Sequence, residues 1–104
     1  MTPSFKIKKA ALSDLGDIAR YTRKTWGREQ EAVYMKGLFN CFEKIAAREV
    51  QTRNISNLMP DCILYQVSHH LIIFRWLEDG RPEIIRVLHE RMNVSLQLLY
   101  RVRP

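Results

Sequence analysis

The order of apolar and polar positions divides the chain into short strands and two helices. Residues 4–9 alternate apolar side chains with lysines, the pattern of a short strand with one face in water. Apolar residues then recur at helical spacing up to Trp26, which predicts a helix capped near Ser13 and ended by Gly27. Residues 28–48 repeat this spacing and predict a second, longer helix.

The connection between the two predicted helices is very short, because only a residue or two at Gly27 lie between them. Helices joined by so short a turn fold back on each other as an antiparallel hairpin. Their apolar stripes then face a common target, and we expect that target to be a sheet formed by the rest of the chain.

The second half of the chain reads as a loop followed by strands. Residues 49–61 have no clear period and carry turn-forming residues, so we expect a loop there, pinned by Leu58 and Met59. Turn sequences at Ser68-His69 and at Asp79-Gly80 separate the apolar runs that follow. These runs predict a three-stranded antiparallel meander over residues 62–68, 70–77 and the front half of the stretch 82–92, around residues 84–88.

Together these elements predict one α+β domain spanning residues 1–104. An N-terminal strand pairs with a strand of the meander, and the antiparallel helix hairpin packs on the resulting sheet. Residues 93–104 form a short helix or tail at the C-terminal end. A groove should remain at the sheet edge, covered either by a partner's helix or strand or by residues 93–104 folding back.

The charge balance favours an acidic or nucleic-acid-containing partner. Seventeen Lys and Arg against 11 Asp and Glu give a formal net charge of +6, which favours encounter with nucleic acid, a nucleoprotein enzyme or an acidic protein. The basic residues are scattered, so we expect a broad positive field and no basic arm.

The cysteines and the apolar runs of the sequence indicate in which cellular compartment the protein is expected. Cys41 and Cys62 have neither CxxC spacing nor a cluster, which favours buried, reduced thiols. The chain shows no signal-peptide h-region and no apolar run long enough to cross a membrane. We therefore expect a soluble cytoplasmic protein without membrane contact.

The histidines give little support for a metal site. His69 and His70 are adjacent, so on a strand they would point to opposite faces, and no cluster of Cys, Asp or Glu lies near them at ligand spacing. A glycine-rich phosphate loop, a Ser-His-Asp pattern and paired catalytic carboxylates are also absent from the sequence. We expect no metal, no cofactor and no ordinary hydrolase chemistry.

His89 is the best candidate for acid–base chemistry, with Arg75 or Arg86 as a phosphate ligand. Strand alternation, however, places His89 on the opposite face from Arg86 unless a bulge intervenes. The favoured interpretation is structural. His89 then bonds to backbone at the strand end, and Arg86 or Arg75 pairs with a carboxylate such as Asp14 or Asp17.

Several sequence segments, in order and over most of the chain, resemble the ParE toxins of the RelE/ParE superfamily. The first is Ala11-Leu12-Ser13-Asp14-Leu15-Gly16-Asp17-Ile18, followed by Tyr21 and Trp26-Gly27. Further on stand Tyr65-Gln66-Val67, His70, Ile72 and Phe74-Arg75. The most specific segment is Glu83-Ile84-Ile85-Arg86-Val87-Leu88-His89-Glu90-Arg91-Met92-Asn93.

The resemblance implies a toxin of a bacterial type II toxin–antitoxin system. Its implied fold is a strand, a two-helix hairpin and a three-stranded meander. Its implied action is poisoning of DNA gyrase without catalysis, reversed when a cognate antitoxin wraps the toxin in a hetero-oligomeric complex. Sequence-specific DNA binding is expected only through the antitoxin. Arg75, Arg86, His89 and Met92 then serve as structural signature residues of the family.

From this we assign two sets of contact residues. The gyrase contact is predicted at the basic C-terminal end and the hairpin tip, at Arg91, Tyr100, Arg101, Arg103 and Trp26. The antitoxin contact is predicted on the helix hairpin, at Leu15, Ile18, Tyr21, Phe39 and Phe42.

The alternative is a RelE-type ribonuclease that cuts ribosome-bound mRNA with Arg75, Arg86 and His89. Two departures from the gyrase-directed branch bear on this choice. Ser68-His69 stands where that branch commonly has Gly-Arg, and the tail from Leu96 to Pro104 is extended. A third class, an inert scaffold domain, predicts no growth arrest when the chain is expressed alone.

Overall fold

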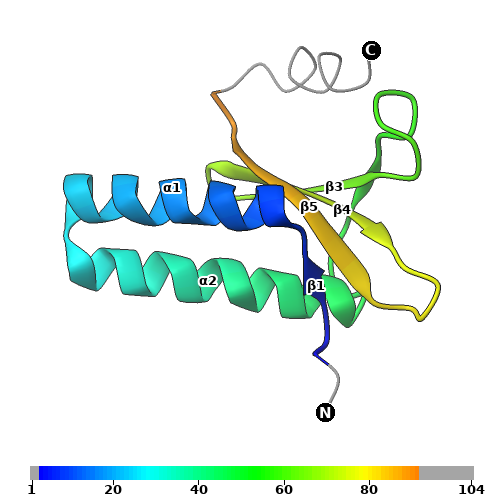
Figure 1. Cartoon of the computed structure of the whole chain (residues 1–104), viewed down its shortest axis with the longest axis horizontal. Helices are drawn as coiled ribbons and strands as arrows, with labels where there is room; N and C mark the ends of the chain where they lie inside the picture. The colour runs from blue at the N-terminus through cyan, green and yellow to red at the C-terminus, as the bar shows by residue number, and fades with distance from the viewer. Residues whose placement is uncertain (1–2, 92–104) are drawn as a thin grey trace.

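Two helices pack on one face of a five-stranded sheet in the computed structural model, which describes residues 3–91 (Figure 1). This arrangement confirms the predicted α+β class. In chain order the elements are β1 (Lys6–Ile7), α1 (Lys9–Trp26), α2 (Arg28–Ala46), β2 (Arg53–Asn54), β3 (Ile63–Val67), β4 (His70–Trp76) and β5 (Pro82–His89).

The sheet order is β1-β5-β4-β3-β2, and its first and last strands in the chain are neighbours. β1 runs parallel to β5, with Lys6 opposite Glu83 and Ile7 opposite Ile84, and the other pairs are antiparallel. The predicted pairing of the N-terminal strand with the meander is therefore confirmed.

The helix hairpin forms around Gly27 as predicted. Gly27 has φ 95°, a conformation that side chains with a Cβ rarely adopt, and its N–H donates to the carbonyl of Arg23 at 2.9 Å. The start of α1 differs from the prediction, because the helix begins at Lys9 and Ser13 lies inside it. Lys8 donates its N–H to Ile84 at 2.9 Å, so the end of the β1–β5 pairing sets the start of the helix without a side-chain cap.

The loop predicted at residues 49–61 contains one further strand, β2, which pairs with β3. A strand of two residues is too short to show alternation, so its sequence carries no signal. Leu58 and Met59 do pin this loop, because they pack with Ile55 and Cys62 against the outer face of the sheet.

The sheet separates two clusters of buried side chains. The helix-side core is made of Ala11, Leu15, Leu38, Cys41, Phe42, Ile45, Ile72, Phe74, Ile84 and Val87. The outer cluster is made of Ile55, Cys62, Ile73, Ile85 and Leu88. Both thiols are buried and free, and burial raises the pKa of each, so they remain protonated and packed as apolar groups.

A β-bulge interrupts the pairing of β4 with β5. Ile73 lies opposite Arg86 and Phe74 lies opposite Ile84, so Ile85 is the extra residue on β5. The bulge shifts the alternation of β5, and Ile84 joins Val87 in the helix-side core. Among residues 3–91, no helix combines the length and the hydrophobicity needed to span a membrane.

Candidate functional site

A cavity of about 440 Å³ lies where the helix hairpin meets the end of β5, and we call it the hairpin groove. Its walls are formed by both helices, the β3–β4 turn and β5. The lining residues are Asp14, Asp17, Ile18, Tyr21, Trp26, Tyr34, His69, His70, Arg86, Val87, Leu88 and His89.

The α1 wall of the groove is aromatic and open to solvent. Asp14, Asp17, Ile18 and Tyr21 follow one another at intervals that keep them on one face of the helix. Tyr21 is 64% exposed and Trp26 is 69% exposed. Large aromatic side chains left open beside a cavity are typical of a binding surface.

An ion pair between Asp14 and Arg86 closes one end of the groove. Arg86 donates from Nε to Oδ2 at 2.7 Å and from Nη2 to Oδ1 at 2.9 Å, and the N–H of Val87 donates to Oδ2 at 3.0 Å. The hydrogen bonds that Arg86 donates to Asp14 raise the pKa of Arg86. This is the pairing with a carboxylate that the sequence predicted for Arg86.

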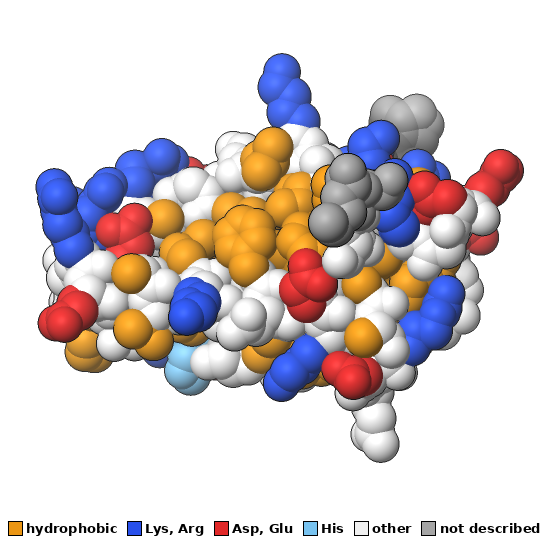
Figure 2. All heavy atoms as spheres, turned by 90° about the horizontal axis from the view of Figure 1, so that it is seen from below, with side chains coloured by type: hydrophobic (Ala, Val, Ile, Leu, Met, Phe, Trp, Pro, Cys, Tyr) orange, Lys and Arg blue, Asp and Glu red, His pale blue; other side chains and the backbone are white. Residues whose placement is uncertain are grey.

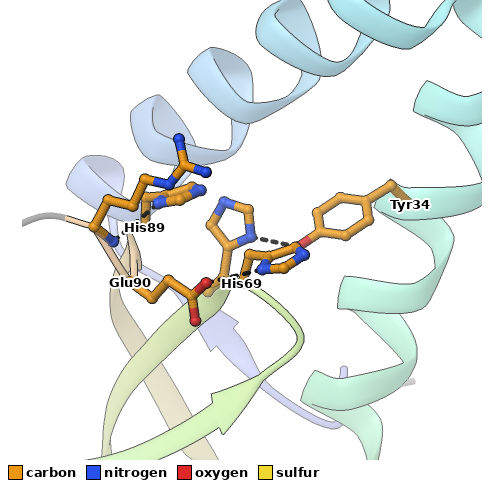
Figure 3. Close-up of polar contacts among 6 residues, drawn as sticks. Tyr34, His69, His89 and Glu90 are labelled. Atoms are coloured by element: carbon orange, nitrogen blue, oxygen red, sulfur yellow. Dashed lines mark hydrogen bonds and ion pairs between the residues drawn. The ribbon is translucent and has the colours of Figure 1, made fainter.

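All three histidines of the chain line the groove and lie close together, with His69 and His89 labelled in Figure 3. The ring of His89 lies 5.2 Å from that of His70 and 6.4 Å from that of His69, centroid to centroid. His70 is buried and shares a hydrogen bond through Nδ1 with the hydroxyl of Tyr34 on α2. Burial, with smaller contributions from the neighbouring histidines, lowers the pKa of His70 to about 4, so this ring is neutral at pH 7.

The other two histidines hold the strand ends together. His69 Nδ1 lies 2.9 Å from Glu90 Oε1, and the Glu90 N–H donates to the His69 carbonyl at 2.8 Å. The hydrogen bond with His69 lowers the pKa of Glu90. His89 Nδ1 accepts from the backbone N–H of Arg91 at 3.0 Å, which confirms the predicted backbone bond at the strand end.

The predicted separation of Arg86 from His89 is wrong. Both residues line the hairpin groove, although the bulge lies before Arg86 and the pairing with β4 is regular from Arg86 to His89. Arg75 does not join them, because it lies near the far end of β4 and its Nε donates to Glu83 at 2.8 Å. The ribonuclease set of Arg75, Arg86 and His89 is therefore not assembled at one place. No group of three His, Cys, Asp or Glu within residues 3–91 is placed to hold a metal ion.

The predicted antitoxin residues divide into buried and accessible ones. Leu15 and Phe42 are 5% and 0% exposed and belong to the helix-side core, so the structure contradicts their assignment as contact residues. The helical spacing of these two residues is explained by their packing against the chain's own sheet. Ile18 and Tyr21 line the groove, whereas the exposed Phe39 packs on Phe5 away from it. Figure 2 shows hydrophobic side chains gathered on this second face, on the α2 side of the molecule.

Of the predicted gyrase contacts, Trp26 lines the groove, and Arg91 is exposed and donates its backbone N–H to His89. Tyr100, Arg101, Arg103 and the signature residue Met92 lie outside the described residues.

Sequence reasoning assigned no site role to Tyr34, His69 or Glu90. The pairs they form join α2, the β3–β4 turn and the end of β5, and such long-range pairs leave no local pattern.

Comparison with known proteins gives consistent matches. A family model described as "ParE toxin of type II toxin-antitoxin system, parDE" matches residues 5–94. Toxin ParE of Escherichia coli is 33% identical over 101 residues, covering 96% of this chain and 97% of that protein. Toxin ParE1 of Caulobacter vibrioides is 33% identical over 94 residues (90% and 96%), and Toxin ParE1 of Mycobacterium tuberculosis is 26% identical over 98 residues (94% and 100%).

Proposed function

Because the chain belongs to the ParE toxin family of type II toxin–antitoxin systems, we propose that it blocks replication by inhibiting DNA gyrase. We further propose that a cognate antitoxin neutralises it by direct binding in a hetero-oligomeric complex, which would act in the cytoplasm. In this proposal only the antitoxin binds DNA sequence-specifically.

The observation that carries the antitoxin proposal is the exposed aromatic wall of the hairpin groove. Tyr21 and Trp26 stand open beside a cavity whose floor is apolar at Ile18 and Val87. Burial of such aromatic anchors usually supplies much of the binding energy of a protein interface. Phe39, on the α2 side, supplies a second accessible contact for an antitoxin that wraps the toxin.

For gyrase, the proposed contacts are Arg91, Tyr100, Arg101 and Arg103, with Trp26 as part of the hairpin tip. The formal net charge of +6 supports approach to an enzyme bound to DNA. We propose that the chain inhibits gyrase by binding and not by catalysis. Arg86 is the only arginine among the described residues that line the groove, and its charge is neutralised by Asp14, so it is not available to a phosphate.

A supercoiling assay with purified gyrase tests the proposal. Toxin in excess over gyrase is expected to stop supercoiling of relaxed plasmid and to accumulate cleaved DNA, and added antitoxin should restore activity. The double variant Arg101→Gln/Arg103→Gln should lose inhibition, whereas Lys36→Gln/Lys44→Gln on α2 serves as the matched loss of two positive charges. Unchanged supercoiling at toxin excess would reject gyrase as the target.

One observation keeps ribosome-dependent mRNA cleavage as the second candidate. Arg86 and His89 line one groove, beside two further histidines. This activity predicts cleavage of ribosome-bound message that disappears in His89→Ala while the variant stays folded. Intact message with wild-type toxin rejects it.

A further inference from the structure

A second cavity, of about 540 Å³, lies between the helix hairpin and the β3–β4 turn, and we call it the tip pocket. It adjoins the hairpin groove, because Trp26, Tyr34 and His69 line both cavities. The residues that line the tip pocket are Thr22, Trp26, Gln30, Tyr34, Ser68 and His69. Its volume is in the size range of pockets that bind small organic groups.

Hydrogen-bonding groups line the tip pocket. Its side chains carry hydroxyl, amide, imidazole and indole groups, and no Asp, Glu, Lys or Arg of residues 3–91 is among them. Tyr34 and His69 each have a hydrogen-bond partner within the fold, which holds these two side chains in place. Gln30 and Ser68 are exposed, so their amide and hydroxyl groups can bond to a ligand. Such donors and acceptors match the edge of a nucleobase.

Trp26 supplies an open aromatic ring to the tip pocket. Its side chain lines the pocket and is still 69% exposed. Every base has a flat π-face, so a base of any identity can stack on an aromatic side chain. In a duplex the bases are already stacked and paired, and reaching one requires its extrusion. An open indole beside a polar pocket therefore fits a base of an unpaired strand.

Positive charges flank this indole. Residues 20–31, which we call the hairpin tip, contain four basic and two acidic residues. Lys24 and Arg28 stand two positions before and after Trp26, are exposed, and take part in no ion pair within residues 3–91. Figure 2 shows Lys and Arg side chains gathered at the left end of the molecule, where the α1–α2 turn lies in Figure 1. Charges on both sides of an aromatic ring match the phosphates that flank a base.

We propose that the hairpin tip binds an unpaired nucleotide of a DNA or RNA strand, without sequence specificity. The base enters the tip pocket and stacks on Trp26, and its edge bonds to Gln30 and Ser68. The phosphates before and after this base lie against Lys24 and Arg28. This contact goes beyond inhibition of gyrase, because it needs neither gyrase nor antitoxin.

Binding of a labelled strand of about ten thymidines to the full-length chain, followed by fluorescence anisotropy, tests the proposal. Trp26→Ala should weaken binding about tenfold by removing the stacked ring, whereas Trp26→Phe should retain most of the affinity. Lys24→Gln/Arg28→Gln should reduce the slope of log K against log salt concentration by about 1.4, because two phosphate contacts are lost. Lys36→Gln/Lys44→Gln, further along α2, removes the same charge and should keep the slope. Circular dichroism verifies the fold of each variant.

Three results would overturn the proposal. These are unchanged affinity in Trp26→Ala, equal affinity for a duplex of the same length, and displacement of the strand by polyglutamate of equal charge. The last of these would assign the hairpin tip to an acidic protein. A strand of uridines, compared with the thymidines, distinguishes RNA from DNA as the source of the nucleotide. Because gyrase and antitoxin are absent from the measurement, its failure is distinct from failure of the proposed function.

Discussion

Asp14 on α1 and Arg86 on β5 form a bidentate ion pair, and the same carboxylate accepts the backbone N–H of Val87 at the bulged strand. Both side chains are only 13% exposed. One carboxylate thereby joins the first helix to the last strand and closes the end of the hairpin groove.

Loss of the Asp14 charge is expected to destabilise the fold. Asp14→Asn leaves Arg86 charged without its partner, and breaking such a nearly buried pair costs about 3 kcal/mol. Asp17→Asn is the matched control, because Asp17 pairs with Arg20 at an exposed site and should cost less than about 1 kcal/mol. Urea denaturation measures both, and equal midpoints would contradict the structural role of Asp14.

Stability should fall as the solution becomes acidic, because of His70. Its pKa is about 4 in the fold against 6.5 in the unfolded chain, so the unfolded state binds more protons between these values. The free energy of unfolding should therefore decrease from about pH 6.5 down to about pH 4, by on the order of 2 kcal/mol. The groups facing this ring are Tyr34, His69, His89 and Glu90.

The variant His70→Gln isolates this contribution. It should flatten the pH profile in that window even though it lowers stability at pH 7. His69→Gln, at an exposed position, should leave the slope largely in place. A slope that survives in His70→Gln would assign the acid sensitivity to another group.

Two glycines, one in the hairpin turn and one in a helix, are expected to respond oppositely to alanine. Gly27 has φ 95°, where a Cβ is strained, so Gly27→Ala should cost about 1 kcal/mol. Gly37 lies within α2 with open space where the methyl group of an alanine would stand, so Gly37→Ala should stabilise by about 0.5–1 kcal/mol. Thermal unfolding separates the two, and a stabilised Gly27→Ala would refute the strained turn.

The aromatic wall is expected to contribute most to antitoxin affinity. Tyr21→Ala removes an open aromatic anchor and should weaken binding by about 2 kcal/mol, near 30-fold in Kd. Val33→Ala is the control, because Val33 is exposed on α2 outside the groove. Calorimetric titration with the purified antitoxin measures the Kd of both variants. Similar affinities of Tyr21→Ala and Val33→Ala would show that the antitoxin does not bind at the aromatic wall.

The sequence predicted those elements whose signals are local. The helix hairpin follows from helical spacing on both sides of Gly27, and the meander follows from β-branched runs between turn residues. The start of α1 at Lys9 was missed, because pairing with Ile84 outweighs the cap at Ser13. The shared groove of Arg86 and His89 was missed because it forms between β5 and the helix hairpin, a long-range packing that the alternation of β5 alone does not contain.

The pairing of β1 with β5 also determines when the fold is complete during synthesis. Lys6 has no strand partner until Glu83 has left the ribosome. Asp14 has no ion-pair partner until Arg86, three residues later, has also left it. A chain interrupted before β5 has its helix hairpin but neither the closed sheet nor the groove. The ribosome must therefore translate through β5 before any copy of this chain has the hairpin groove.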